Sequence, residues 1–409
     1  MSSTALFRTE AEIDIGRSDW GGPITVDTSL GTIQLRISGD LQPLEAVWEE
    51  LQAVSPCTGA QTFEWAQAWN RHVLGPEGRE PVIAVGTAAD GQILFLWPFE
   101  MRRRAGMRVL KWLSQDDANY NLGLFAPGIA AALSGEDVSR LLLLVARHSG
   151  AVAAVLEAQP VTFDGIANPF AKLPHQPAPS NGYAVRLGNF TALYEQRFSK
   201  RSRNTINRKE RRLAEAGRLA YGWAEARDER LRLIDIFFAQ KARQFAAQGV
   251  RDIFDAHARA FYRELALLEG DNPSRLRLGY VTLDDKVLAI FSGTLGHNRL
   301  LIVLCSLVEG DHQRQSPGAL LIRHQVEEAC AQGLALYDFG AGSGAHKEQW
   351  SDVTEVLFDS FIAFKPYALA LTLPLAARSY LKRAIKTNRQ VWPVAQKLRA
   401  RLFGRPTRA

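Results

Sequence analysis

The stretch QSPGALLIRHQVEEACAQGLALYDFGAGSGAHKEQW, residues 315–350, decides the expected fold. Ser316 and Pro317 are typical of the start of a helix, because serine can cap free N–H groups and proline fixes a helical φ. A strand, LALYDFG, and a glycine-rich loop over residues 340–350 are expected after this helix. Free N–H groups and the helix dipole at its first turn favour an anion, and Gly318 is expected to let that anion come close.

The segments around this stretch predict a sheet. An antiparallel meander of three strands with turns at DDK and GHN is expected. Its strands are RLRLGYVTL at residues 275–283, KVLAIFSGTL at 286–295 and RLLIVLCSL at 299–307. Residues 355–364 are expected to form the last strand of this half. The first half has a similar order of helices, hairpin, strand, polar loop, helix and strand, which indicates a duplicated α+β unit.

Length and composition indicate a folded protein with more than one domain. The chain has 409 residues, of which 46% are hydrophobic and 22% charged. We expect one unit over 1–188, a second unit over 189–366 and a basic amphipathic helical tail over 367–409. The first residues do not resemble a signal peptide, and no apolar run is long enough for a transmembrane helix, so a cytoplasmic location is expected.

The three cysteines form no C-x-x-C pair, which favours a reducing compartment. Cys305 and Cys330 lie in apolar runs and are expected to be core thiols. The eight histidines are scattered, and no metal site is expected. No Gly-Lys-Ser/Thr follows the loop before Pro317, so this is not a P-loop.

The net charge of +6 is unevenly distributed. Residues 366–409 contain ten Lys or Arg and no Asp or Glu, so the rest of the chain has a net charge of −4. The tail is therefore expected either to contact an anionic membrane, at its inner face, or to dock on the acidic body of the protein itself. Because the basic pI belongs mainly to the tail, no specific nucleic-acid partner is expected.

The meander, the Gln/Arg-rich loop and the helix resemble the order of the GNAT acyltransferase fold. The GNAT pyrophosphate loop reads Gln/Arg-x-x-Gly-x-Gly/Ala, and residues 313–318 resemble it with Ser316 at the first glycine. Five motifs follow one another along the chain: LWPFEMRR, ANYNLGLF, SKRSRNTINRKERRLAEAG, SPGALL and YDFGAGSGAHKEQW. In this order they resemble the GNAT acetyltransferases of the cellulose-biosynthesis type, which are distant relatives of the FemABX aminoacyltransferases.

This resemblance, over residues 44–366, implies an α+β fold of two tandem GNAT-like units, with mixed sheets flanked by helices. It also implies acyl transfer from acetyl-CoA to a hydroxyl or amine of a polysaccharide, envelope or sugar-like acceptor. The acceptor, the acyl chain, N- versus O-transfer and the oligomeric state stay open. Two alternatives stay open as well: a FemABX-like aminoacyltransferase that uses aminoacyl-tRNA, and a non-catalytic accessory protein of polysaccharide synthesis.

The candidate residues fall into three groups. The proton-transfer and orienting candidates are Asp338, His346 and Lys347, the last through its likeness to a FemABX lysine. The cofactor-binding candidates are Gln313, Arg314, Gln315, Ser316, Gly318 and Ala319. The substrate-binding candidates are Asp117, Asn119, Tyr120, Trp97 and Arg203.

Each group also has a purely structural interpretation. Asp338 can bond its own glycine turn, His346 can be a solvated loop residue, and Lys347 can belong to a surface ion pair. Trp97 can be a core residue, and the basic run that contains Arg203 can be a solvated helix face.

Overall fold

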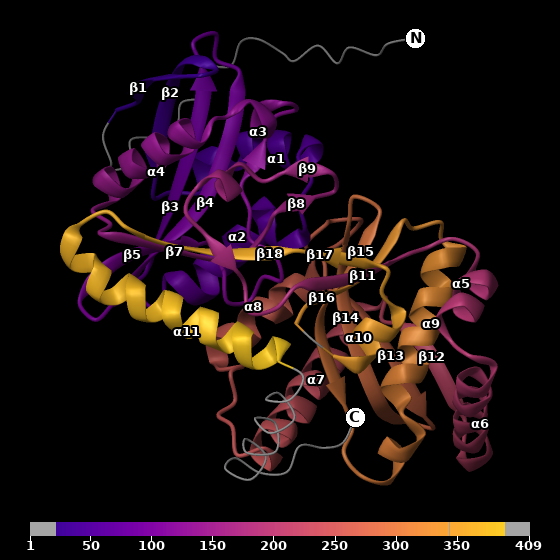
Figure 1. Cartoon of the computed structure of the whole chain (residues 1–409). Coiled ribbons are helices and arrows are strands. Elements are labelled where there is room, and N and C mark those ends of the chain that lie inside the picture. Colours follow the sequence, from indigo (N-terminus) through magenta and orange to yellow (C-terminus); the bar gives the residue numbers. More distant parts are fainter. Residues whose placement is uncertain (1–21, 343, 389–409) are drawn as a thin grey trace, which may run out of the picture.

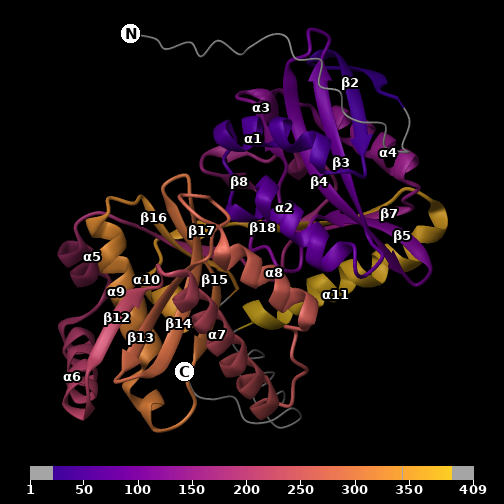
Figure 2. The same ribbon diagram turned by 180° about the vertical axis from the view of Figure 1, so that it is seen from behind.

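The computed structural model describes residues 22–342 and 344–388 (Figure 1). Two β-sheets are each covered by helices, and Figure 2 shows the same arrangement from behind. The part of the expected tail from residue 389 onward, and the first 21 residues, lie outside the described residues.

The first sheet has nine strands in the order β1-β2-β3-β4-β5-β7-β18-β10, with β6 paired to β4. Their bounds are Ile24–Thr28, Gly31–Ser38, Glu80–Ala88, Ile93–Arg104, Met107–Trp112, Ala153–Pro160, Leu357–Ala363 and Gln176–Pro177, with β6 at Leu124–Phe125. The parallel pair β5–β7 makes this sheet mixed. A small separate hairpin is formed by β8 (Thr162–Phe163) and β9 (Ile166–Ala167).

The second sheet has seven strands in the order β12-β13-β14-β15-β16-β11-β17. Their bounds are Leu219–Trp223, Arg277–Leu283, Lys286–Gly296, Arg299–Leu307, Leu336–Ala341, Gly182–Arg186 and Val353–Glu355. The antiparallel meander β13–β14–β15 is confirmed, and β15 pairs with β16 in parallel.

Helices cover both faces of the sheets. Their bounds are α1 Glu45–Val54, α2 Phe63–Trp69, α3 Ile129–Ala132, α4 Gly135–Ser149, α5 Phe190–Arg197, α6 Lys200–Ala216, α7 Arg227–Ala247, α8 Ala256–Leu267, α9 Pro317–Ala331, α10 Ala345–Trp350 and α11 Leu369–Thr387. The expected α+β architecture of two mixed sheets flanked by helices is therefore confirmed. The loop expected after Gly340 is helical in its second half, because α10 occupies it.

The last expected strand is divided between the two sheets. Residues of β17 pair with β11 in the second sheet, and Val356 then separates β17 from β18, which pairs with β7 in the first sheet. β11 comes from the proline-rich connection and inserts between β16 and β17. The chain thus passes between the sheets twice, and the first sheet is complete only after residue 363.

The two units share one hydrophobic core. Trp65 and Trp69 of α2 both lie 5.1 Å, between ring centroids, from Phe261 of α8, in edge-to-face contacts. The same cluster of buried side chains continues to Leu278 and Leu304 of the second sheet. Such aromatic burial is a large stabilising contribution, so the units are held together by core packing and not by a flexible linker.

A buried ionic cluster crosses the same boundary. The guanidinium of Arg299 donates to Asp338 at 2.6 Å, to Glu355 at 3.0 Å and to Asp164 of the first unit. Its Cζ lies 4.5 Å above the ring of Phe163. Burial raises the pKa of Asp338 and of Glu355, and the charge of Arg299 opposes this rise. One cation therefore keeps the two buried carboxylates, Asp338 and Glu355, compatible with burial, and it also pairs with the exposed Asp164.

Removing this cation is expected to destabilise the whole chain. Arg299→Met should lower the free energy of unfolding by about 3 kcal/mol, because buried carboxylates would lose their partner. Urea unfolding at pH 7.5 measures this loss, which should shrink toward pH 5 as the carboxylates with raised pKa become protonated. Arg218→Met, at an exposed pair 3.9 Å from Asp285, is the matched control. Equal midpoints for the two variants would contradict the assigned role of Arg299.

Candidate functional site

A seam opens in the second sheet between β15 and β16. The two parallel strands pair only from Arg299 with Leu336 to Leu301 with Asp338, although β15 continues to Leu307 and β16 to Ala341. The register of β15 with β14 shifts just beyond this point, between Ser292 and Gly293. Where the strands part, their backbone N–H and C=O groups no longer pair with each other and need other partners.

Polar groups of both units meet where the strands part. Asn119, from the loop after β5, donates to the carbonyl of Ile302 at 3.3 Å and accepts from the N–H of Ala341 at 2.9 Å. Gly340 has a φ of +71°, and a Cβ there would lie 2.3 Å from the Asn119 Oδ1. The predicted residue Asn119 thus bridges both strands of the seam.

A groove lies between α6 and the first turn of α9. Its cavity has a volume of about 330 Å³ and is lined by Arg201, Ser202, Thr205, Ile206, Lys209, Gln315, Ser316, Ala319, Leu320 and Gln349. Lys209 Nζ donates to the Ser316 hydroxyl at 2.7 Å. None of these lining residues is acidic, and the positive ends of two helices converge here, so the groove favours an anion.

The side chain of Ser316 does not cap α9 as expected. Its φ of 53° and ψ of 57° are left-handed, and its side chain makes no capping hydrogen bond. A left-handed residue with a side chain costs about 1 kcal/mol relative to glycine. The loop pattern that the sequence resembles has a glycine at this position, and glycine adopts a left-handed conformation without steric cost.

The other residues of the predicted anion loop have mixed roles. Gln315 and Ala319 line the groove. The Gln313 amide donates to the carbonyl of Val308, and Arg314 is exposed. A Cβ on Gly318 would lie 2.8 Å from Leu307, so this glycine lets α9 pack closely on β15. The expected approach of an anion to Gly318 stays a prediction.

Asp338 is fully buried at the base of the seam. Its Oδ1 accepts from Tyr120 at 2.9 Å and from the Gly340 N–H at 2.7 Å, and its Oδ2 accepts from Arg299. Tyr120 is also fully buried. Both residues therefore join the two units, and neither side chain is exposed to solvent.

Lys347 and His346 lie on α10, next to the end of β16. Lys347 Nζ donates to the carbonyls of Gly340 and Ala341 at 3.1 and 2.9 Å. Burial lowers the pKa of Lys347, and the charge of Asp338 partly opposes this. His346 is exposed beside the ring of Phe339, and desolvation followed by the charge of Lys347 lowers its pKa. A neutral imidazole at pH 7 can accept a proton.

The remaining predicted residues lie elsewhere. Trp97 is fully buried in the first core, stacked 4.5 Å from Phe95. Arg203 donates to the carbonyl of Phe198 and pairs with Glu195, which holds the end of α5. Asp117 accepts from the Tyr262 hydroxyl at 2.9 Å. These contacts are structural.

Two features of the site were not predicted from the sequence: the wall that the basic helix forms in the groove, and the exposure of Cys305. Arg201, Ser202, Thr205 and Lys209 form one wall of the groove, and the spacing of the basic run at i and i+4 could have indicated this face. Cys305, expected in the core, is exposed. Its exposure follows from the seam, because β16 no longer runs beside β15 at residue 305.

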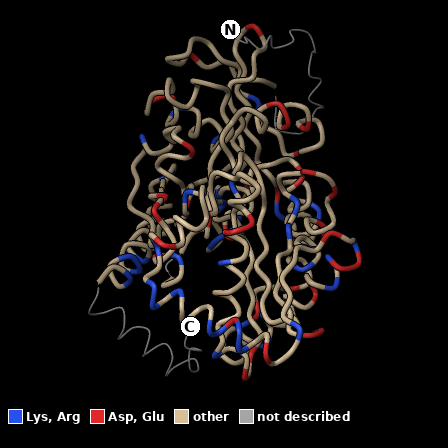
Figure 3. The backbone as a smooth tube through the Cα atoms, turned by 90° about the vertical axis from the view of Figure 1, so that its right-hand side faces the viewer, with Lys and Arg blue, Asp and Glu red and all other residues tan. Residues whose placement is uncertain are grey.

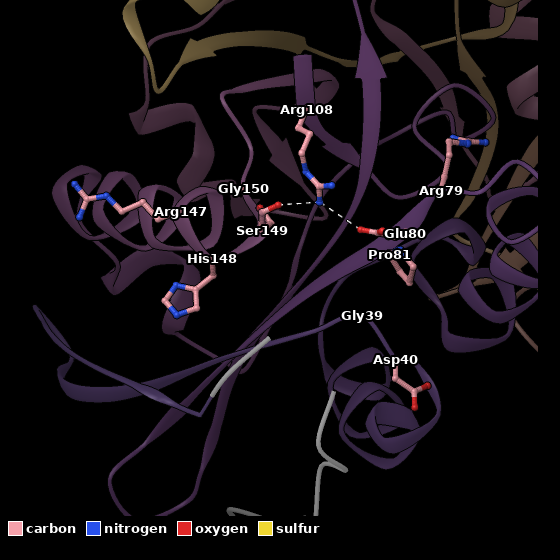
Figure 4. Close-up of a pocket in the computed structure, with 10 residues that line it drawn as sticks. All are labelled: Gly39, Asp40, Arg79, Glu80, Pro81, Arg108, Arg147, His148, Ser149 and Gly150. Atoms are coloured by element: carbon pink, nitrogen blue, oxygen red, sulfur yellow. Dashed lines mark hydrogen bonds and ion pairs between the residues drawn. The ribbon is translucent and has the colours of Figure 1, made fainter. Parts of the chain in front are cut away.

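A second cavity of about 740 Å³ lies at one end of the first sheet (Figure 4). Arg108, which points into it, donates to the carbonyl of Ser149 at 2.9 Å and to Glu80 at 3.3 Å. Asp40 also lines it. Because acids accompany the cations here, this cavity lacks the uniform positive charge of the groove.

Comparison with known proteins places the seam and the groove in a recognised domain. Residues 200–348 match the family model described as an acetyltransferase (GNAT) domain. No curated protein matches the sequence. The chain has a GNAT-type acyltransferase fold.

Solved structures extend the likeness to both units. FemX is 13% identical, with a TM-score of 0.53 over 81% of this chain and 98% of its own. A conserved protein of unknown function from Bacteroides thetaiotaomicron VPI-5482 is 13% identical, with a TM-score of 0.50 over 80% of this chain and 99% of its own. At such identities the likeness concerns the fold, which here consists of two GNAT-like units.

The pKa of Asp117 gives a pH test of its structural role. Burial raises this pKa to about 6. The folded state therefore holds the proton more tightly than the unfolded state, and this stability is lost as the pH rises from about 4 through about 6. Asp117→Asn should match the wild type near pH 4 and exceed it in stability at pH 8, as measured by thermal unfolding.

Asp116 is the matched control for this test. Burial raises the pKa of Asp116, but the charges of Lys111 and Arg102 outweigh that effect and lower it. Asp116→Asn should therefore lose stability at pH 8, the opposite sign. If both variants shift in the same direction at pH 8, the electrostatic assignment of Asp117 is wrong.

Proposed function

We propose that the chain is an acyl-CoA-dependent acyltransferase. The observation that carries this proposal is the acid-free groove at two helix N-termini, next to a seam between parting strands. The groove suits a diphosphate, and the seam suits an extended thioester arm that bonds to backbone. The match of residues 200–348 to an acetyltransferase domain supports acetyl-CoA as the donor.

The second unit, residues 189–366, would hold the acyl-CoA. Lys209 and Arg201 would neutralise the diphosphate, together with the positive end of the α9 dipole. The exposed backbone N–H groups of β15 would then stabilise the oxyanion that forms on the thioester carbonyl.

The transfer itself would be a direct attack. An acceptor hydroxyl or amine forms a bond to the carbonyl carbon, the bond from that carbon to sulfur breaks, and CoA leaves as the thiolate. His346 receives the acceptor proton, because its lowered pKa leaves it neutral. Lys347 orients the acceptor or the oxyanion. Asp338 acts as a positioning residue here, since its oxygens are occupied by Tyr120, Gly340 and Arg299.

The acceptor would lie between the seam and the first unit, residues 1–188, which contributes Asn119 at that place. The resemblance of the sequence to acetyltransferases of cellulose biosynthesis favours a sugar-like acceptor of an exopolysaccharide or of the envelope, on the cytoplasmic side of the membrane.

The helix α11 would contact that membrane. Its inner face docks on the protein itself, where Ser379 donates to Asp359 at 2.7 Å and Arg383 to the carbonyl of Ala178 at 2.6 Å. Its outer face exposes large apolar side chains: Leu369, Leu373, Tyr380 and Leu381. Residues 365–388 contain five Lys or Arg and no Asp or Glu, which suits anionic lipid headgroups. In the described part of the chain, no helix is long and apolar enough to cross a bilayer.

Acetyl-CoA binding tests the donor. Calorimetry should detect one acetyl-CoA per chain, and Lys209→Met should weaken binding about tenfold, because one charged hydrogen bond is worth roughly 1.4 kcal/mol. Lys286→Met, at the exposed first residue of β14, should bind as the wild type does. Failure to bind acetyl-CoA together with binding of aminoacyl-tRNA would replace this donor with the FemABX-like one; failure to bind either would favour an accessory protein.

Sedimentation with vesicles tests the membrane contact. Leu373→Glu combined with Leu381→Glu should abolish co-sedimentation with vesicles that contain anionic lipid and leave acetyl-CoA binding unchanged. Ile253→Glu, at a similarly exposed apolar residue, is the control and should still sediment. If the wild type stays in the supernatant with anionic vesicles, α11 does not bind membranes.

A further inference from the structure

A second basic hollow lies beside the groove on α6. It has a volume of about 500 Å³ and is lined by Lys200, Arg201, Asn204, Thr205 and Arg208. These residues follow each other at spacings of one and three, so they share one face of the helix. Figure 1 shows α6 at the edge of the molecule, next to β12 and α9.

The charges of this hollow are not balanced by the protein. No acidic residue lines it. Over residues 22–342 and 344–388, no ion pair is formed by Lys200, Arg201 or Arg208, whereas Arg203 on the same helix pairs with Glu195. Figure 3 shows Lys and Arg interspersed with Asp and Glu along much of the chain, so a hollow lined by three cations and no acid is a local feature.

The first turn of α6 increases this imbalance. It contains no acidic residue, and it carries Lys200 and Arg201 at the positive end of the helix dipole. Cations at this end are unfavourable for the helix by a few tenths of a kcal/mol each, whereas an anion would be favourable. The sequence of α6 therefore suits a helix that binds an anion from outside the protein.

The hollow and the groove are parts of one surface. Arg201 and Thr205 line both of them, with Lys209 and Ser316 on the groove side and Lys200 and Arg208 on the other side. Two adjacent anion sites with shared walls fit one ligand that carries two separate phosphate groups. The ligand of the groove, a CoA thioester, has such a pair: its diphosphate and the 3′-phosphate of its adenosine.

We propose that the hollow around Arg208 binds the 3′-phosphate of the acyl-CoA whose diphosphate lies in the groove. This inference rests on the proposed function and goes further, because it makes Lys200 and Arg208 specificity-determining residues. They would select CoA thioesters over thioesters that lack the 3′-phosphate. The phosphomonoester, with a charge near −2, gains more from Arg208 than a phosphodiester does.

Calorimetry with two probes tests the proposal: acetyl-CoA and 3′-dephospho-acetyl-CoA. The wild type should prefer acetyl-CoA by about tenfold. Arg208→Gln should remove most of this preference by weakening acetyl-CoA binding, with the affinity for the dephospho compound unchanged. Unchanged affinity also shows that the variant is folded. Arg232→Gln, an exposed arginine on α7, should retain the full preference.

The outcomes separate this inference from the proposed function. Equal binding of both probes by the wild type, or an unchanged preference in Arg208→Gln, would overturn the 3′-phosphate site and leave the acyl-CoA donor in place. Binding of neither probe by the wild type would overturn both.

Discussion

The Arg299 guanidinium is the interaction on which the arrangement of the site depends. It lies at the start of β15, where that strand still pairs with β16, and it holds carboxylates from β16, from β17 and from the hairpin of the first unit. Because one of these, Asp338, also accepts from Tyr120, the first unit is fixed at the point where the seam begins to open. Asn119, the residue before Tyr120, is thereby placed across the parting strands.

Two features of the fold make this cluster rigid. The aromatic core shared by α2 and α8 leaves no freedom for the units to rotate independently, and the exchange of β11 and β18 between the halves of the chain ties each sheet to both. The seam is therefore bordered by a wall of fixed shape from the first unit. Packing therefore fixes the position of the donor groove relative to the acceptor side of the site. Such a fixed arrangement favours the correct relative orientation of two substrates.

Local patterns predicted the parts of the fold in which neighbours in sequence are neighbours in space. The meander followed from alternation and turn residues, and the start of α9 from Ser-Pro-Gly. The division of residues 353–363 between two sheets could not be predicted, because only the single exposed residue Val356 separates β17 from β18. The burial of Asp338 and the exposure of Cys305 could not be predicted from the sequence either, because both depend on where β15 and β16 part. The groove was predicted only in part. The loop before α9 was recognised as an anion site, whereas the basic helix α6 that faces this loop was treated as a separate run of positive charges.

The central claim is that one acyl-CoA occupies the groove and the seam together. A crystal structure of the complex with acetyl-CoA tests it most directly. We expect the diphosphate within hydrogen-bond distance of Lys209 Nζ at the first turn of α9, with the thioester between β15 and β16 near Ile302. Density for the ligand in the 740 Å³ cavity of the first sheet, with an empty groove, would contradict it.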